Sequence, residues 1–247
     1  AGEADLDLTL LALDASSHLT DIYRNQSPVV FFSATLSPLP YYLTLLDARS
    51  ATDKPEVIRL PSPFPKERRL TICFEAYSIR YTDRARTLPE VAKLVCEAAL
   101  LRKGHYLVFS PSFAYQSQLV RALSHIENKG IDFLVQPSGM TEGQKEKYLA
   151  YFRGQERENS LVGLTVLGSL FNEGIDLVGE ELTGVMVIGT GIPGLSPERD
   201  LLSQYYDAKS GNGFEYAYMW PGFNRVTQAA GRLIRSEDDF GIVLLID

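Results

Sequence analysis

The chain has 247 residues, of which 45% are hydrophobic and 22% charged, enough for one large or two small domains with a substantial core. Its formal net charge of −7 gives no overall attraction to nucleic acid, so any DNA binding must be local. Two cysteines exclude a disulfide framework, and three histidines give no metal-binding spacing. The sequence predicts no metal site, no membrane span and no signal peptide, and therefore a cytoplasmic location.

The first 62 residues are predicted to form a separate region. Short helices are expected over 16–24 and 39–47. Between them, the run 29–32 has the continuous apolar character of a strand buried on both faces. Because such a run is not expected to stay exposed, it should pack on the second domain or pair with another copy. A proline-rich connector over 55–65 contains a short predicted strand, 57–60, and the main boundary is placed here.

From residue 70 onward, strand and helix patterns alternate. Strands are predicted at 70–76, 106–109, 131–135, 161–166, 185–188 and 240–246. Helices are predicted at 88–102, 113–128, 141–153, 197–209 and 223–236. The alternation indicates one α/β domain over 63–247, with a mostly parallel central sheet and helices on both faces.

The last predicted helix carries the sequence QAAGRLIR at 228–235. A helix would place Gln228, Arg232 and Arg235 on neighbouring turns of one side, with Gly231 allowing close approach of another backbone. Two guanidiniums beside a glutamine suit a polyphosphate that must be held in a fixed geometry. The spacing alone also fits a solvated helix face, or structural arginines buried against acidic partners such as Asp238 or Asp239.

The segment 168–179 follows the predicted strand 161–166, at the carboxyl edge of the sheet where ligands of α/β proteins bind. It presents two carboxylates, Glu173 and Asp176, between glycines at 174 and 179. An ordinary loop is the alternative, because no histidine or nucleophile lies nearby in sequence.

Hydroxyl groups follow two other strand patterns. Ser110 and Ser112 lie where a strand meets a helix, so they either hold a phosphate or form an ordinary N-cap. Ser33 and Thr35 follow the run 29–32, where they either bridge a network or cap the next turn.

The stretch GTGIPG at 189–194 matches the dinucleotide fingerprint G-x-G-x-x-G. Its context argues against a dinucleotide site, because Pro193 and Pro197 delay the next helix and pyrophosphate binding needs a helix N-terminus. A glycine-proline loop at the end of a strand is the preferred interpretation.

The order of these motifs resembles the XPD/DinG class of superfamily-two ATP-dependent DNA helicases. The matching parts are SATLSP at 33–38, YLVFSPS at 106–112, FNEGID at 171–176 and QAAGRLIR at 228–235. The segment 195–222 is similar to that of the bacterial branch, and the resemblance runs from about residue 28 to the end. Such helicases bind ATP between two RecA-like domains and single-stranded DNA across both.

The chain contains no Gly-Lys and no Asp-Glu dipeptide, so it lacks both the P-loop and the D-E-x-H motif of the first domain. We therefore expect a C-terminal fragment: the tail of the first motor domain over 1–62 and the second RecA-like motor domain over 63–247. ATP and Mg²⁺ would bind in the intact protein, with none bound by this fragment alone, and the fragment should be inactive. The partners implied are single-stranded DNA and the N-terminal helicase domain of the same chain, in a bacterial nucleoid.

The resemblance also implies residue roles. Arg232 and Arg235 would act as arginine fingers on the γ-phosphate, and Gln228 would position the phosphate or the attacking water. The ATP site would include Glu173, Gly174, Asp176 and Gly231. Ser33 and Thr35 would couple hydrolysis to domain closure. DNA phosphates would be held by Ser110, Ser112, Gly168 and Ser169. A non-catalytic RecA-like module that binds nucleic acid or protein is the alternative function.

Overall fold

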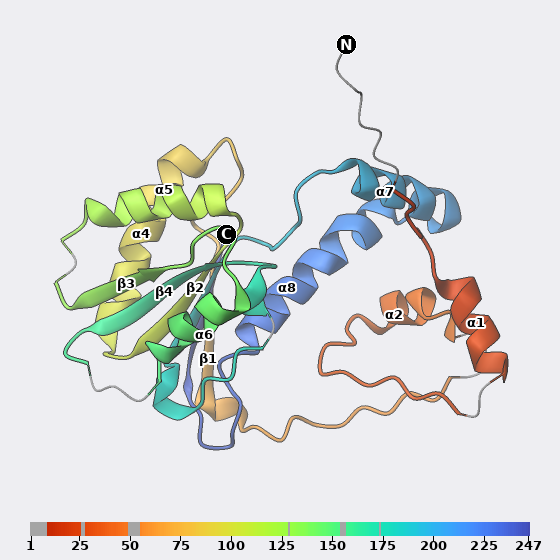
Figure 1. Ribbon diagram of the computed structural model, residues 1–247, viewed down its shortest axis with the longest axis horizontal. Coiled ribbons are helices and arrows are strands. Elements are labelled where there is room, and N and C mark those ends of the chain that lie inside the picture. The colour runs from red at the N-terminus through yellow and green to blue at the C-terminus, as the bar shows by residue number, and fades with distance from the viewer. Residues whose placement is uncertain (1–8, 26–27, 49–54, 128, 154–156, 173) are drawn as a thin grey trace, which may run out of the picture. The chain divides into compact units, whose positions relative to one another are not determined.

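The computed structural model describes the chain except for residues 1–8, 26–27, 49–54, 128, 154–156 and 173 (Figure 1). The chain divides into two compact units, one made of residues 1–60 with 193–221 and the other of residues 61–192 with 222–247. The division after residue 60 lies close to the boundary expected at 62. Residues 193–221, which are predicted above to lie in the second domain, group with the first 60 residues in this division.

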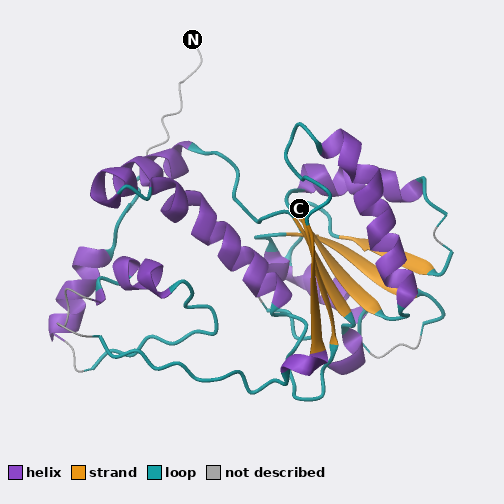
Figure 2. Cartoon of the chain, turned by 180° about the vertical axis from the view of Figure 1, so that it is seen from behind, coloured by secondary structure: helices purple, strands orange, loops and turns teal. Residues whose placement is uncertain are grey.

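The larger unit is built on a six-stranded sheet in which all neighbouring strands are parallel (Figure 2). The strands are β1 (Arg69–Phe74), β2 (His105–Ser110), β3 (Ile131–Val135), β4 (Ser160–Val166), β5 (Gly184–Ile188) and β6 (Gly241–Ile246). Their order across the sheet is β1-β6-β5-β2-β4-β3. The parallel arrangement confirms the predicted α/β fold, and it places all six carboxyl ends along one edge.

Helices cover both faces of this sheet, as predicted. On one face lie α4 (Arg84–Leu101) and α5 (Phe113–Ser124). On the other lie α6 (Glu142–Ala150) and residues 222–230 of α8 (Trp220–Ala230). Alternate residues of β2 supply the two cores: Tyr106 and Val108 face the first pair of helices, and Leu107 and Phe109 face the second. Short 3-10 turns complete the unit: η1 (Lys66–Arg68), η2 (Leu170–Asn172) and η3 (Gly179–Glu181).

The smaller unit contains α1 (Ser16–Asn25), α2 (Leu39–Leu45), α7 (Pro197–Ser210) and a π-helical turn, η4 (Glu215–Met219). Aromatic packing joins its two stretches of sequence. The ring of Tyr41 lies 5.0 Å from that of Tyr216 and 6.3 Å from that of Trp220, and Tyr206 stacks on Tyr216 at 4.3 Å. These contacts explain why 193–221 group with the N-terminal residues.

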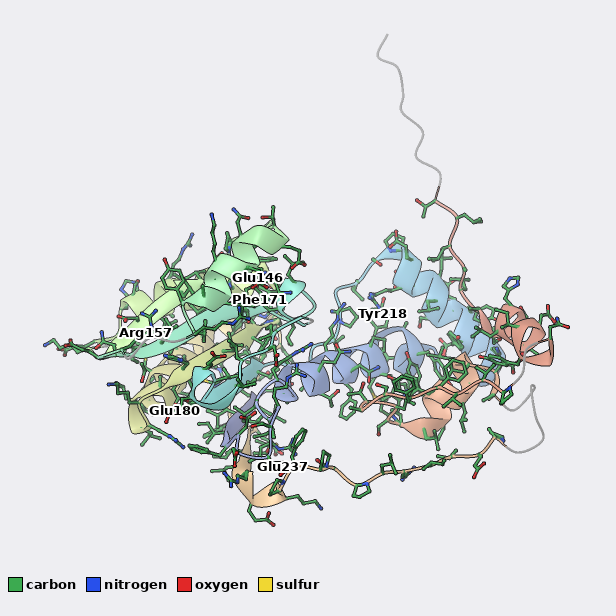
Figure 3. The ribbon with its side chains drawn as sticks, turned by 60° about the horizontal axis from the view of Figure 1, so that its bottom comes forward. Glu146, Arg157, Phe171, Glu180, Tyr218 and Glu237 are labelled. Atoms are coloured by element: carbon green, nitrogen blue, oxygen red, sulfur yellow. The ribbon has the colours of Figure 1, made fainter. Side chains whose placement is uncertain are left out.

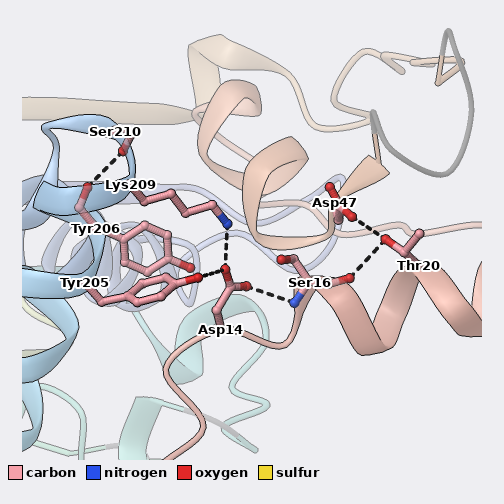
Figure 4. A network of polar contacts seen from close by, with 8 residues as sticks. All are labelled: Asp14, Ser16, Thr20, Asp47, Tyr205, Tyr206, Lys209 and Ser210. Atoms are coloured by element: carbon pink, nitrogen blue, oxygen red, sulfur yellow. Dashed lines mark hydrogen bonds and ion pairs between the residues drawn. The ribbon is translucent and has the colours of Figure 1, made fainter.

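A polar network supports the same association (Figure 4). The carboxylate of Asp14 accepts hydrogen bonds from the Tyr205 hydroxyl at 2.7 Å and from Lys209 Nζ at 2.6 Å. Burial raises the pKa of Asp14, but its hydrogen bonds to Lys209, Tyr205 and Ser16 outweigh that effect and hold the pKa below its usual value.

Several predicted elements differ from the observed ones. The runs 29–32 and 57–60 are not strands, because a strand needs a neighbour to pair with and neither run has one among the described residues. Val30 is 77% exposed and Phe32 is 90% exposed. The expectation that this run packs on the second domain or pairs with another copy stays a prediction. Helix α4 begins at Arg84 rather than near Pro89, and α5, α6 and α8 end before the predicted residues.

Among the described helices, none combines the length and the apolar character that crossing a membrane requires. The described side chains also contain no group of three or more His, Cys, Asp or Glu residues placed to hold a metal ion.

Candidate functional site

The segments 171–179 and 228–239 are joined by one buried carboxylate, that of Asp239, which is 2% exposed. Its Oδ1 accepts from the backbone N–H of Gly179 at 2.8 Å and from Ser236 Oγ at 2.7 Å. Its Oδ2 accepts from the backbone N–H groups of Arg235 at 2.6 Å and Ser236 at 2.8 Å. Burial raises the pKa of Asp239, but the four hydrogen bonds outweigh it and lower the pKa from its usual value.

The Arg235 side chain is held by the other loop. Its Nη2 donates to the carbonyl oxygen of Ile175 at 3.0 Å. Asp239 accepts a hydrogen bond from the backbone N–H of Arg235 and not from its guanidinium. Asp238 Oδ1 lies 3.9 Å from Arg68 Nη2. Within the described parts of the chain, Arg235 forms no ion pair. The alternative in which this arginine is buried against Asp238 or Asp239 is therefore wrong, and its side chain is exposed.

The three predicted catalytic residues do not share one helix face. Helix α8 ends at Ala230, so Gln228 lies in its last turn, Arg232 in the following turn and Arg235 in an irregular loop. Two causes end the helix here: Gly231 has low helix propensity, and Asp239 captures the N–H of Arg235. Gln228 and Arg232 are half-buried, and Gly231 is exposed.

The 171–179 loop is anchored by apolar residues. Phe171 and Ile175 are buried, and the Phe171 ring, labelled in Figure 3, lies 4.7 Å from the Tyr148 ring of α6. Asp176 is exposed, and its backbone oxygen accepts from Arg153 Nη2 at 3.5 Å. Glu173 lies outside the described residues, so its predicted role stays a prediction.

A buried lysine lies against the same loop. Gly174 has a φ of +65°, and a Cβ added there would lie 3.1 Å from Lys145 Nζ. Lys145 is buried on α6, and its Nζ lies 3.5 Å from Glu142 Oε2. The sequence alone does not single out this lysine, because a single lysine in an amphipathic helix is usually exposed. The positive φ favours glycine at position 174, and a side chain there would be in tight contact with the lysine.

The predicted DNA-binding serines have different surroundings. Ser110 is completely buried at the end of β2, and its predicted role as a DNA ligand stays a prediction. Ser112 caps α5, since its Oγ accepts from the backbone N–H of Tyr115 at 3.2 Å. This cap fits the interpretation of Ser112 as an ordinary N-cap. Ser112 is half-buried.

The turn after β4 holds the other two predicted DNA ligands. Gly168 has a φ of +74°, and a Cβ there would lie 3.1 Å from the Arg225 guanidinium carbon, so an arginine from α8 covers this turn. Ser169 Oγ lies 3.2 Å from Oε1 of buried Gln136, which also accepts from the Val166 N–H at 3.0 Å. Arg225 and Gln136 were not found from the sequence, because only the tertiary fold brings them to the turn.

Ser33 and Thr35 lie in the smaller unit. Their hydroxyl oxygens are 3.2 Å apart, and the Thr35 N–H donates to Ser33 Oγ at 3.1 Å. This is a local exposed turn, and a coupling role for the pair stays a prediction.

The loop 189–194 contains one closely packed glycine, Gly191. Gly189 and Gly191 have positive φ values of 85° and 68°. A Cβ on Gly191 would lie 2.7 Å from the Gly222 oxygen, and one on Gly222 would lie 2.8 Å from the Ile192 nitrogen. The loop backbone therefore packs directly on α8, and no helix begins until Pro197. This arrangement presents no helix N-terminus to a pyrophosphate, which argues against a dinucleotide site.

The chain belongs to the helicase C-terminal domain family, which matches residues 95–247. It resembles an apo XPD structure with a TM-score of 0.69 and 18% identity over 95% of this chain and 47% of that one. This likeness shows the fold.

Two curated relatives extend the comparison. "Probable ATP-dependent helicase MJ0942" of Methanocaldococcus jannaschii is 29% identical over 94% of this chain and 36% of its own length. "3'-5' exonuclease DinG" of Bacillus subtilis is 26% identical over 91% of this chain and 24% of its own length. The chain thus spans between about a quarter and about a third of these relatives.

Proposed function

We propose that this chain is the second motor domain of an ATP-dependent DNA helicase and supplies arginine fingers to ATP bound by an N-terminal domain of the same protein. The observation that carries the proposal is the junction at Asp239, which fixes the arginine-bearing loop against the 171–179 loop. The names of the relatives, including "ATP-dependent DNA helicase DinG" of Photobacterium profundum, support the activity of the intact protein.

The surroundings of Arg235 fit a phosphate ligand. Of the described groups, the Ile175 carbonyl is the one that accepts from its guanidinium, and this contact sets the direction of the side chain. Guanidinium carries five N–H donors in a planar fork, so the others suit two-point contact with a γ-phosphate. Such a group stabilises the negative charge that develops on the phosphoryl group during transfer.

Neighbouring groups complete this proposed half-site. Arg232 and Gln228 precede Arg235 in the same connection, and Gly231 lies between them. Gly174 and Asp176, with Glu173, belong to the loop that Arg235 contacts. The P-loop and the magnesium-binding carboxylates would come from the N-terminal domain, since this chain has neither Gly-Lys nor Asp-Glu. When bound, Mg²⁺ would neutralise phosphate charge that these arginines do not reach.

The carboxyl edge of the sheet is the proposed track for single-stranded DNA. Gly168, Ser169 and Ser112 lie at ends of β4 and β2 on this edge, with Arg225 beside Gly168. Backbone amides and a guanidinium at such an edge suit phosphates and do not read bases.

The test uses the intact parent protein. Arg235→Ala should leave ATP binding largely unchanged, because the P-loop half still holds the nucleotide, and should lower single-turnover hydrolysis by roughly 10³-fold or more. Arg235→Lys should restore little, since an ammonium lacks the planar fork. The measurement is ATP hydrolysis with saturating single-stranded DNA.

Arg68→Ala is a matched control. Arg68 also contacts the 231–239 loop, donating to the Asp238 carbonyl at 3.1 Å. It lies just before β1 and is not one of the proposed phosphate ligands. Its loss should change the rate by no more than a few-fold. An Arg235→Ala enzyme with the wild-type rate would disprove the arginine-finger role. ATP hydrolysis by the present chain alone would show that the division of the site between two domains is wrong.

A further inference from the structure

The loop between β1 and α4 lies at the same edge of the sheet as the proposed DNA track. A Cβ placed on Gly189, after β5, would lie 3.6 Å from Ile79 of this loop and 3.8 Å from Pro111, after β2. The Ile79 N–H also donates to Asp247 Oδ1, after β6, at 3.2 Å. The loop is therefore fixed beside the carboxyl ends of three neighbouring strands.

This loop is locally basic in an acidic chain. Arg80, Arg84 and Arg86 fall within seven residues, against a formal net charge of −7 for the whole protein. The acid among them, Asp83, accepts a hydrogen bond from Ser78 Oγ at 2.8 Å. A concentration of guanidiniums at a ligand-binding edge is the local electrostatic feature that DNA binding by an acidic protein requires.

An exposed aromatic ring, that of Tyr81, follows Arg80 in the sequence and lies against Arg84. Tyr81 is 86% exposed, and Arg84 Cζ lies 5.7 Å from its ring centroid. The same guanidinium lies 5.5 Å from the ring of buried Tyr115, and its Nε donates to the Ile79 carbonyl at 2.9 Å. Arg84 is thus held between a buried and an exposed tyrosine, so it supports Tyr81 from within the fold.

Hydrogen bonds also fix the backbone on both sides of the ring. Thr87 Oγ1 donates to the Ser78 carbonyl at 2.8 Å, and the Asp83 N–H donates to the Arg80 carbonyl at 2.8 Å. A ring that is already positioned loses little conformational entropy when a flat ligand stacks on it.

We propose that Tyr81 is a stacking site for a nucleobase of single-stranded DNA, with Arg80 meeting an adjacent phosphate. Bases stack on aromatic rings without regard to sequence, and guanidiniums follow the phosphate backbone. The proposal rests on the proposed DNA-binding function and lengthens its track. From the Gly168 turn after β4 to this loop after β1 the sheet has four strand spacings, roughly 19 Å.

The experiment measures binding of this chain to a fluorescent oligothymidylate and to an abasic oligomer of equal length, by anisotropy over a range of salt concentrations. Tyr81→Ala should weaken binding of oligothymidylate by roughly ten-fold or more. It should leave the salt dependence and the abasic affinity unchanged, because the tyrosine contributes stacking and no charge. Tyr81→Trp should restore binding.

Arg80→Ala should instead change the salt dependence of binding. Loss of one phosphate contact should reduce the slope of log affinity against log salt by about 0.7, for both oligomers. A slope that stays the same for Arg80→Ala would overturn the phosphate contact.

The chain offers a matched control in Tyr151. It is 52% exposed and also contacts an arginine, with Arg157 Cζ 5.8 Å from its ring. It follows α6, which returns to the amino edge of the sheet where β4 begins. Tyr151→Ala should therefore bind both oligomers like the wild type.

The outcomes distinguish failure of the Tyr81 stacking site from failure of the proposed DNA track. If wild-type protein binds oligothymidylate and Tyr81→Ala binds equally well, the stacking site is wrong while the DNA track stands. Equal losses on both oligomers would also reject stacking. If the wild-type chain binds neither oligomer, the proposed DNA track fails together with the stacking site.

Discussion

At the scale of single residues, Asp239 determines the geometry of the proposed phosphate site. A carboxylate is an acceptor at both oxygens, and here all four hydrogen bonds come from two loops that are 60 residues apart. An asparagine of the same shape would replace one acceptor oxygen by an NH₂ donor facing N–H groups. The charge is therefore part of the fold of these loops.

Asp239→Asn should lower the free energy of unfolding by about 2 kcal/mol at pH 7, because hydrogen bonds to a charged acceptor are lost. The lowered pKa means that this stability is present above the unfolded value of about 3.9 and is lost as pH falls through the folded pKa. Urea unfolding from pH 7 to pH 3 should show the two proteins converging below about pH 4.

Asp238→Asn is the control, since the side chain of Asp238 is 98% exposed and should contribute little. A deficit in Asp239→Asn that is the same at every pH would show that the carboxylate charge is not what holds the loops.

At the scale of elements, the sheet could be predicted well and the ends of several elements could not. The predicted strand 131–135 matches β3, and 106–109 lies inside β2. For β2 the reason is that a strand covered on both faces is a continuous apolar run. The end of α8 depends on Asp239, a contact that helical periodicity does not contain. The run 29–32 has strand character but no neighbour among the described residues with which to pair.

The candidate site shows the same limit. Motif order located the loops that carry Arg235 and Asp176, since motifs are local in sequence. It did not find Lys145, Arg225 or Tyr81, because each acquires its significance from contacts with residues distant in the chain or from exposure at a particular edge. For Ser110, position after a strand suggested a ligand, yet the fold buries it.

Gly191 gives a prediction about how the 189–192 loop packs on α8. Gly191→Ala should destabilise the protein by about 3 kcal/mol, because the new Cβ would both strain a left-handed backbone and meet the Gly222 oxygen at 2.7 Å. Gly139→Ala is matched in backbone conformation, with a φ of +72°, but its Cβ would have nothing within 4 Å. It should cost only about 1 kcal/mol. Equal losses in thermal unfolding would show that backbone strain alone, and not close packing, explains Gly191.

At the scale of the whole molecule, the chain passes between its two units more than once. It runs from the smaller unit into the larger one after residue 60, returns for 193–221 and then re-enters the larger unit. Each unit has its own interactions: the larger has two apolar cores on a parallel sheet, and the smaller has the tyrosine cluster and the Asp14 network. The proposed phosphate and DNA sites both belong to the larger unit.

The smaller unit exposes apolar residues that a folded protein normally covers. Val30 and Phe32 are 77% and 90% exposed, and Ile58 and Leu60 are 76% and 85% exposed. Under the proposed function, the first motor domain of the parent would cover them. In this chain they should instead drive association between copies, because contiguous exposed apolar residues favour burial against a second surface.

Replacing Val30 and Phe32 together by serine should therefore reduce self-association of the chain, measured by light scattering over a range of concentrations. Neither side chain is buried, so the substitution removes exposed apolar area without opening a cavity, and the thermal unfolding transition should keep its midpoint. Leu100 and Leu101, which are also exposed but lie on α4 of the larger unit, provide the control when replaced by serine in the same way. That control should leave association as it is. A wild-type chain that stays monomeric at high concentration would contradict the prediction, and it would mean that these four residues are tolerated in water.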